Sequence, residues 1–173
     1  MRIVRMGELA VSATPGDELT SIGLGSCIGV ALVDRARGVA ALAHVMLPDA
    51  TADLDAPAGK YADRAIPALV AAAEELGARR VRLEAVLVGG AQMFDVGVGS
   101  ALDIGARNAV AVRAALQSAR IPVRAEQVGG RRGRTMRVHV DPLHVTVKEA
   151  GGREAELWNG SPTARRSAAE VTH

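Results

Sequence analysis

Short apolar runs rich in β-branched residues alternate along this chain with two longer stretches whose apolar residues recur at helical spacing. Glycine, proline or aspartate separates most of these segments, and such residues favour turns. Strand-like runs occupy residues 8–13, the run that leads into Gly23, 28–33, 39–46, 81–88, 123–128, 135–140 and 143–147. Helical spacing occupies residues 64–76 and 104–119, and Asp103 can cap the second helix. The alternation predicts an α/β fold.

The core of such a fold must be aliphatic in this chain. Hydrophobic residues make up 49% of the sequence but aromatic residues only 2%, so Val, Leu, Ile and Ala must fill the interior. Residues 1–158 are long enough to bury one such core, and we predict a single domain. Residues 159–173 are rich in Ser, Thr, Arg and Ala and are predicted to form a flexible tail.

Charge and composition argue against nucleic-acid binding. The net charge is +2, and the chain has one Trp, one Tyr and one Phe, too few to form a stacking surface for bases. The basic cluster Arg131-Arg132-Gly133-Arg134 is interpreted as a solvated loop, with steering toward an acidic partner as the alternative.

The sequence predicts a cytoplasmic protein. It has no signal-peptide pattern at residues 1–13 and no apolar run near the roughly 20 residues that span a bilayer. Its single cysteine, Cys27, cannot form an internal disulfide, which suits a reducing compartment.

Residues 28–33 and 39–46 have the length and spacing of an antiparallel hairpin, with Gly38 in the connecting loop. Reversal of the chain at Arg35-Ala36 would pair residues whose numbers sum to 71 or 72. His44 would then lie opposite Cys27 or Ile28, so the hairpin predicts that Cys27 and His44 are neighbours.

This predicted adjacency changes how the two residues are interpreted. A lone cysteine is more often a small buried residue, and a histidine in an apolar run is more often part of the core. Together they form the minimal apparatus of thiol acyl transfer, because an imidazole can take the thiol proton. Cys27 also ends the turn Gly23-Leu24-Gly25-Ser26-Cys27, whose backbone N–H groups could stabilise an oxyanion.

No cofactor or metal is predicted. No cysteine or carboxylate cluster at ligand spacing accompanies His139 and His144. The glycine-rich turn lacks the Lys-Ser/Thr pair of a phosphate-binding loop and leads into a strand rather than a helix.

Five blocks in order resemble the chemoreceptor glutamine deamidases, called CheD, of bacterial and archaeal chemotaxis. The blocks are Gly23-Leu24-Gly25-Ser26-Cys27, Ala43-His44-Val45-Met46-Leu47-Pro48, Gly59-Lys60-Tyr61-Ala62-Asp63, Gly89-Gly90-Ala91 with Met93-Phe94, and Ile104-Gly105-Ala106-Arg107-Asn108. The resemblance as a whole extends over about residues 8–148.

The resemblance implies a nucleophile at Cys27 and a base at His44. It also implies a hydroxyl residue that orients the histidine, usually Thr in the family and Ser21 here, with Thr20 beside it as the alternative. The implied fold is a mainly antiparallel β-sandwich with two helices on one side, in α-β-β layers similar to the toxin deamidases.

The implied activity converts glutamine side chains on the cytoplasmic helices of chemoreceptors to glutamate and releases ammonia. The CheC phosphatase is an implied second partner. We expect Gly25, Ser26, Gly90 and Asn108 to contact the substrate. Two alternatives remain: an adapter that binds the receptor or CheC with incidental catalysis, and a related thiol activity such as transglutamination or hydrolysis of a small amide.

Overall fold

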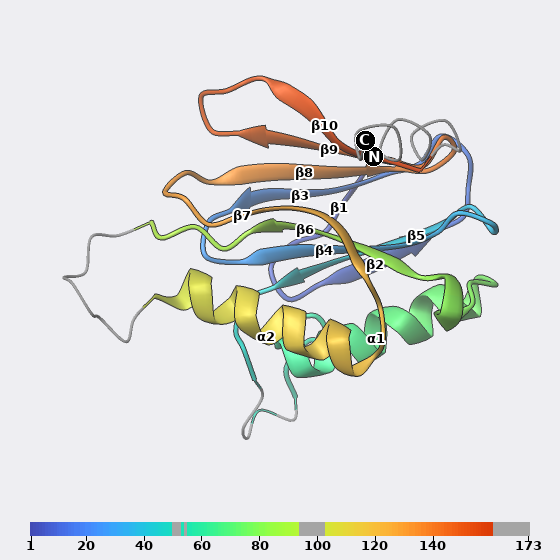
Figure 1. Cartoon of the computed structure of the whole chain (residues 1–173), viewed down its shortest axis with the longest axis horizontal. Helices are drawn as coiled ribbons and strands as arrows, with labels where there is room; N and C mark the ends of the chain where they lie inside the picture. The colour runs from blue at the N-terminus through green and yellow to red at the C-terminus, as the bar shows by residue number, and fades with distance from the viewer. Residues whose placement is uncertain (50–52, 54, 94–102, 161–173) are drawn as a thin grey trace, which may run out of the picture.

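The computed structural model describes residues 1–49, 53, 55–93 and 103–160, and these residues form three layers (Figure 1). A pair of helices covers one face of a five-stranded sheet, and a second five-stranded sheet covers the other face. The inner sheet has the order β2-β5-β4-β6-β7, and the outer sheet has the order β1-β3-β8-β9-β10.

The elements have the following bounds: β1 Arg2–Ile3, β2 Leu9–Ser12, β3 Glu18–Leu24, β4 Ile28–Asp34, β5 Val39–Val45, α1 Ala62–Glu75, a 3₁₀ turn Arg80–Arg82, β6 Glu84–Gly89, α2 Ile104–Ser118, β7 Val123–Val128, β8 Arg134–His139, β9 His144–Glu149 and β10 Glu154–Asn159. Most neighbouring strands are antiparallel, but β1 pairs with β3 and β6 pairs with β7 in parallel.

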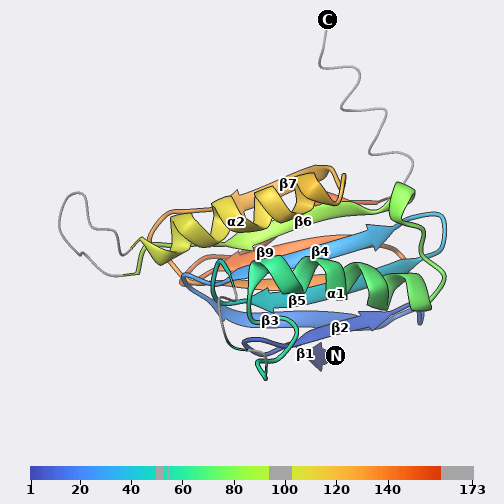
Figure 2. The same cartoon turned by 90° about the horizontal axis from the view of Figure 1, so that it is seen from below.

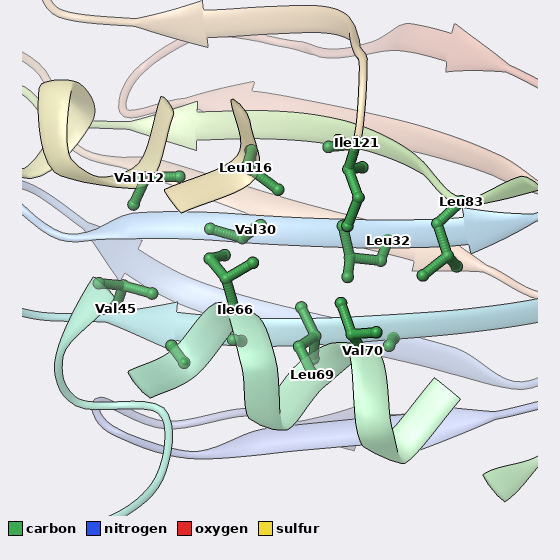
Figure 3. Packing of buried hydrophobic residues seen from close by; sticks show 14 of the residues in the cluster. Val30, Leu32, Val45, Ile66, Leu69, Val70, Leu83, Val112, Leu116 and Ile121 are labelled. Carbon is green, nitrogen blue, oxygen red and sulfur yellow. The ribbon is translucent and has the colours of Figure 1, made fainter. Parts of the chain in front are cut away.

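One aliphatic core lies between the helices and the inner sheet. The helices lie side by side across the sheet, as Figure 2 shows from below. Ile66, Leu69 and Val70 of α1 recur at helical spacing and pack toward Val30 and Leu32 of β4 (Figure 3). Full burial of each such side chain stabilises the fold by about 2 kcal/mol.

A second core lies between the two sheets. Alternate residues of β4 and β5 face it, including Ala31, Val33 and Leu42, while Met136 and Val138 of β8 face it from the outer sheet. Because β4 and β5 lie between two cores, every one of their residues is buried. Cys27 packs against this second core.

The predicted α/β fold, with an antiparallel-dominated sandwich and two helices on one side, is confirmed. The predicted helices agree with α1 and α2 to within two residues at each end. The Asp103 side chain accepts a hydrogen bond from the Ala106 N–H at 3.0 Å, which confirms the predicted cap. No described helix is long and apolar enough to cross a bilayer.

The hairpin register differs from the prediction by one residue. His44 pairs with Gly29, so the paired numbers sum to 73. The Asp34 carboxylate accepts from the N–H groups of Ala36 and Arg37, which extends β4 to Asp34 and moves the reversal one step along the chain.

Three further predictions need correction or completion. The predicted strand at residues 81–88 begins at Glu84, because the chain makes a 3₁₀ turn at Arg80–Arg82. The strands β1 and β10 were not predicted, because each is short or polar and lies at a sheet edge. Asn159, the first residue of the predicted tail, ends β10 and pairs with His144, and residues 161–173 of that tail lie outside the described residues.

Candidate active site

Cys27 lies in the turn between β3 and β4, at the end of the molecule where β6 ends and α2 begins (Figure 1). Its side chain is half-buried. The end of β6 and the start of α2, both distant in sequence, contact this turn.

Glycines allow these segments to approach closely. A Cβ atom at Gly89, whose φ is +122°, would lie 2.1 Å from the Cys27 carbonyl oxygen. A Cβ atom at Gly105 would lie 2.5 Å from the Gly90 carbonyl oxygen, so the first turn of α2 packs directly on the segment after β6. Larger residues at these positions would push the Cys27 turn out of place.

The carbonyl groups of the turn are held from within the protein. The carbonyl oxygen of Gly25 accepts from the Ala91 N–H at 2.8 Å, that of Ser26 from Asn108 Nδ2 at 2.9 Å, and that of Cys27 from the Gly90 N–H at 2.9 Å. In a trans peptide the N–H points opposite to the carbonyl of the preceding residue. The N–H groups of Ser26 and Cys27 therefore point away from the groups that hold the turn.

Asn108 joins the two segments that carry the sulfur and the ring. It is fully buried in α2, and its Nδ2 donates to Met46 O as well as to Ser26 O, both at 2.9 Å. Met46 directly follows β5, which contains His44. The amide nitrogen thus fixes the distance between the Cys27 turn and the end of β5.

Cys27 and His44 lie on the same side of the inner sheet. His44 pairs with Gly29, and Cys27 precedes Gly29 by two residues, which is a diagonal step in an antiparallel pair. Both side chains face the space between the sheets. His44 lies two residues after Leu42 and so shares its face of the strand, and Cys27 packs against the same core as Leu42.

A main-chain carbonyl determines the tautomer of His44. The ring is 2% exposed, and its Nδ1 lies 3.2 Å from the carbonyl oxygen of Val4. A carbonyl can only accept, so Nδ1 carries the proton and Nε2 carries the lone pair. Nε2 is buried and has no hydrogen-bond partner within the described residues, so the Cys27 thiol does not donate to it in this structure.

Ser21 binds the same carbonyl. Its Oγ donates to Val4 O at 3.0 Å from the neighbouring strand β3. The Thr20 hydroxyl donates instead to Glu18 Oε1 at 2.7 Å, because successive side chains of a strand point to opposite faces. Ser21, rather than Thr20, therefore shares an acceptor with His44.

Burial favours the neutral forms of both candidate catalytic groups. Burial raises the pKa of the Cys27 thiol above its ordinary 9.0. Burial also lowers the pKa of His44 below its ordinary 6.5, against the opposing effects of the Val4 carbonyl and Glu8. Both shifts favour a thiol and an uncharged imidazole over a thiolate and an imidazolium at neutral pH.

Other residues predicted for the site lie around the turn. Gly25 and Ser26 are partly exposed within it, and Met93 packs 3.1 Å from a Cβ position on Gly25. Gly90 is buried behind the turn, as is Asn108. Phe94 of the CheD-like blocks lies outside the described residues.

Two residues near the site were not predicted from the sequence. The Val4 carbonyl carries no residue-type signal, because any residue supplies a carbonyl. Arg134, interpreted as part of a solvated loop, is a buried residue of β8, whereas Arg132 is exposed. Alternation with the apolar Met136 and Val138 could have shown that Arg134 faces inward.

Metal binding has no visible basis in the described part of the chain, where no cluster of three or more His, Cys, Asp or Glu side chains could hold an ion. His139 and His144 stack with ring centroids 4.1 Å apart on the outer sheet.

The fold and this geometry define a class: layered α/β proteins with a half-buried cysteine in a glycine-rich turn, on the same sheet face as a neutral histidine. The model of the family described as CheD chemotactic sensory transduction matches residues 46–149. The chain belongs to the CheD family.

Similar proteins cover nearly the whole chain. A probable chemoreceptor glutamine deamidase CheD of Symbiobacterium thermophilum is 44% identical over 160 residues, which is 91% of this chain and 97% of the relative. The chemoreceptor glutamine deamidase CheD of Thermotoga maritima is 40% identical over 88% of this chain and 94% of its own length. A probable chemoreceptor glutamine deamidase CheD of Clostridium botulinum is 43% identical over 86% of this chain and 92% of its own length.

Proposed function

We propose that this protein is a chemoreceptor glutamine deamidase with Cys27 as nucleophile and His44 as general base. The supporting observation is the position of Cys27 one diagonal step from His44, whose Nε2 is the unprotonated ring nitrogen. Relatives named as chemoreceptor glutamine deamidases support the substrate. Catalytic hydrogen bonds are often unformed without substrate, so the open thiol–imidazole contact fits a resting enzyme.

In the proposed reaction, His44 Nε2 takes the thiol proton as Cys27 Sγ attacks the carboxamide carbon of a glutamine. The N–H groups of Ser26 and Cys27 bind the oxyanion of the tetrahedral intermediate. His44 returns the proton to the leaving nitrogen, which departs as ammonia and leaves a thioester. Water, deprotonated by His44, then releases glutamate and the free thiol.

The surrounding residues have positioning roles in this proposal. Ser21 and the Val4 carbonyl orient His44. Asn108 and Gly90, which we expected from the sequence to contact the substrate, are buried, and we assign them instead to holding the Cys27 turn. Gly25 and Ser26 lie at its partly exposed surface and contact the substrate. The reaction requires no metal or organic cofactor.

We place the protein in the cytoplasm, where it acts on the cytoplasmic helices of receptors. Conversion of Gln to Glu adds a negative charge to such a helix. The CheC phosphatase is proposed as a second partner, to be tested by co-purification of the two proteins.

The test is incubation of the protein with a receptor cytoplasmic fragment, with Gln-to-Glu conversion read by mass spectrometry. Wild type should convert specific glutamines, and Cys27→Ala should convert none. Loss of His44, as His44→Ala, should slow turnover by about 100-fold or more.

Two other results would redirect the proposal. Equal support of receptor signalling by wild type and Cys27→Ala would favour an adapter. Incorporation of a primary amine at the glutamine would indicate transglutamination, because the thioester would then react with an amine instead of water.

A further inference from the structure

Arg134 is a charged residue that the proposed reaction does not use, yet its side chain is 6% exposed. It lies in β8 and faces the space between the sheets with Met136 and Val138. A guanidinium stays charged in a protein, and burial of a charge is costly unless its hydrogen bonds compensate.

The compensation of this charge is incomplete. Arg134 Nη1 donates to the carbonyl oxygens of Gly129 at 2.7 Å and Gly89 at 3.2 Å. Its Nε is buried without a hydrogen-bond partner in the described residues, and Glu149 Oε2 lies 4.0 Å from it. A buried charge with an unpaired donor contributes little to the stability of the fold, so stability alone does not explain this residue.

The two carbonyl groups that Arg134 binds belong to the segments behind Cys27. Gly89 ends β6, and the Gly129 N–H donates to the Gly89 carbonyl at 2.9 Å. Gly90, which follows Gly89, donates its N–H to the Cys27 carbonyl. Arg134 is thus two hydrogen bonds and one peptide unit from the backbone of Cys27.

This segment needs an external brace. Gly89 and Gly90 both have positive φ, at +122° and +66°, and glycine in such conformations has many alternatives of similar energy. Their closeness to the Cys27 carbonyl leaves no room for a Cβ at Gly89, so side-chain packing cannot fix the segment there.

We propose that Arg134 is a positioning residue for catalysis: its guanidinium joins the ends of β6 and β7 and so holds the Cys27 turn, with its outward N–H groups, in the reactive geometry. The predicted effect of Arg134 on turnover rests on the proposed function. Its effect on the backbone can be measured without a substrate.

The test compares Arg134→Met with Arg132→Met. Arg132 is the matched control, because it is 67% exposed and its Nε lies 3.8 Å from the same Glu149 carboxylate. Two quantities are measured: kcat and KM for a receptor fragment, and hydrogen exchange of the backbone amides of Gly90, Ala91 and Gly129.

For Arg134→Met we expect kcat to fall by about 100-fold, as for a displaced catalytic group, with KM within about twofold. Exchange at the three amides should accelerate while exchange in β9 and β10 stays as in wild type. Arg132→Met should match wild type in both measurements.

Wild-type kcat in a folded Arg134→Met protein would overturn the proposal, as would exchange that rises equally throughout both sheets. If Arg134→Met does not fold, Arg134→Lys answers the same question, because it keeps the charge but its side chain is shorter, so its ammonium ends short of the Nη1 position that donates to both carbonyls. If wild type itself converts no glutamine, the proposed function fails, and the exchange comparison still decides whether Arg134 braces the turn.

Discussion

Ser21 and His44 donate to one oxygen atom, the carbonyl of Val4, at 3.0 and 3.2 Å. The Ser21 hydroxyl and the His44 ring therefore share the carbonyl of the residue that directly follows β1. Val4 is itself fixed, because its N–H donates to Thr20 O at 2.8 Å and its side chain is buried.

Removal of the Ser21 hydroxyl should weaken catalysis without abolishing it. Ser21→Ala removes one hydrogen bond to Val4 O, worth about 1 kcal/mol, so kcat should fall by about five- to tenfold. Ser21→Thr keeps the hydroxyl and should retain most activity. Thr20→Val, which removes the hydroxyl that donates to Glu18, is the control and should leave kcat unchanged. An inactive Thr20→Val with an active Ser21→Ala would reverse the assignment.

The pH dependence of turnover should reflect the uncharged His44. Because burial lowers the pKa of His44, the acid limb of kcat/KM should have its midpoint below 6.5. The same shift leaves the free energy of unfolding at its full value above pH 6.5 and lowers it as the pH falls from there through the lowered pKa of His44. Initial rates and urea unfolding across this range measure both effects. A midpoint above 6.5 would contradict them.

Alkylation of the free protein should report a neutral thiol. Since burial raises the pKa of Cys27, its rate of reaction with iodoacetamide should keep rising beyond pH 9.0. The chain has one cysteine, so mass spectrometry follows this thiol alone. A constant, high rate across acidic and neutral pH would instead reveal a thiolate–imidazolium pair in the resting protein.

The hairpin that brings His44 close to Cys27 was predictable because its contacts are local and both strands have clear apolar patterns. Its register was wrong by one residue, since the sequence gives no sign that the Asp34 carboxylate binds the N–H groups of its own loop. Such a side-chain-to-backbone hydrogen bond changes the loop length that the strand pattern alone would set.

Long-range contributors to the site were harder to predict. Val4 lies 40 residues from His44 and acts through its carbonyl, which no sequence pattern marks. Asn108 entered through the resemblance to CheD, but its role as a link between Ser26 and Met46 depends on how α2 packs across the sheet.

A methyl group at Gly89 should be far more damaging than one at Gly38. Both have positive φ, which costs an alanine about 1 kcal/mol, but only Gly89 has backbone within contact distance of a new Cβ. We expect Gly89→Ala to lower the free energy of unfolding by about 2–4 kcal/mol and to abolish turnover. Gly38→Ala should stay active. Thermal unfolding and receptor deamidation compare the two, and equal effects would show that the close approach is unimportant.

Asn108→Ala should destabilise the protein and inactivate it together. Two part-buried carbonyl groups, of Ser26 and Met46, would lose their donor, at a cost of about 2–4 kcal/mol. Gln117→Ala, at an exposed position of the same helix, is the control for changes in helix propensity. Denaturant unfolding gives the stability, and the deamidation rate at a temperature where the variant is folded gives the activity. Full activity of the folded Asn108→Ala protein would remove this residue from the site.

A single amide nitrogen of Asn108 joins the turn that carries Cys27 to the residue that follows the strand of His44. Because Asn108 lies on α2, rotation or sliding of this helix would pull on both segments together, so the geometry of the Cys27–His44 pair depends on how the helix packs on the sheet.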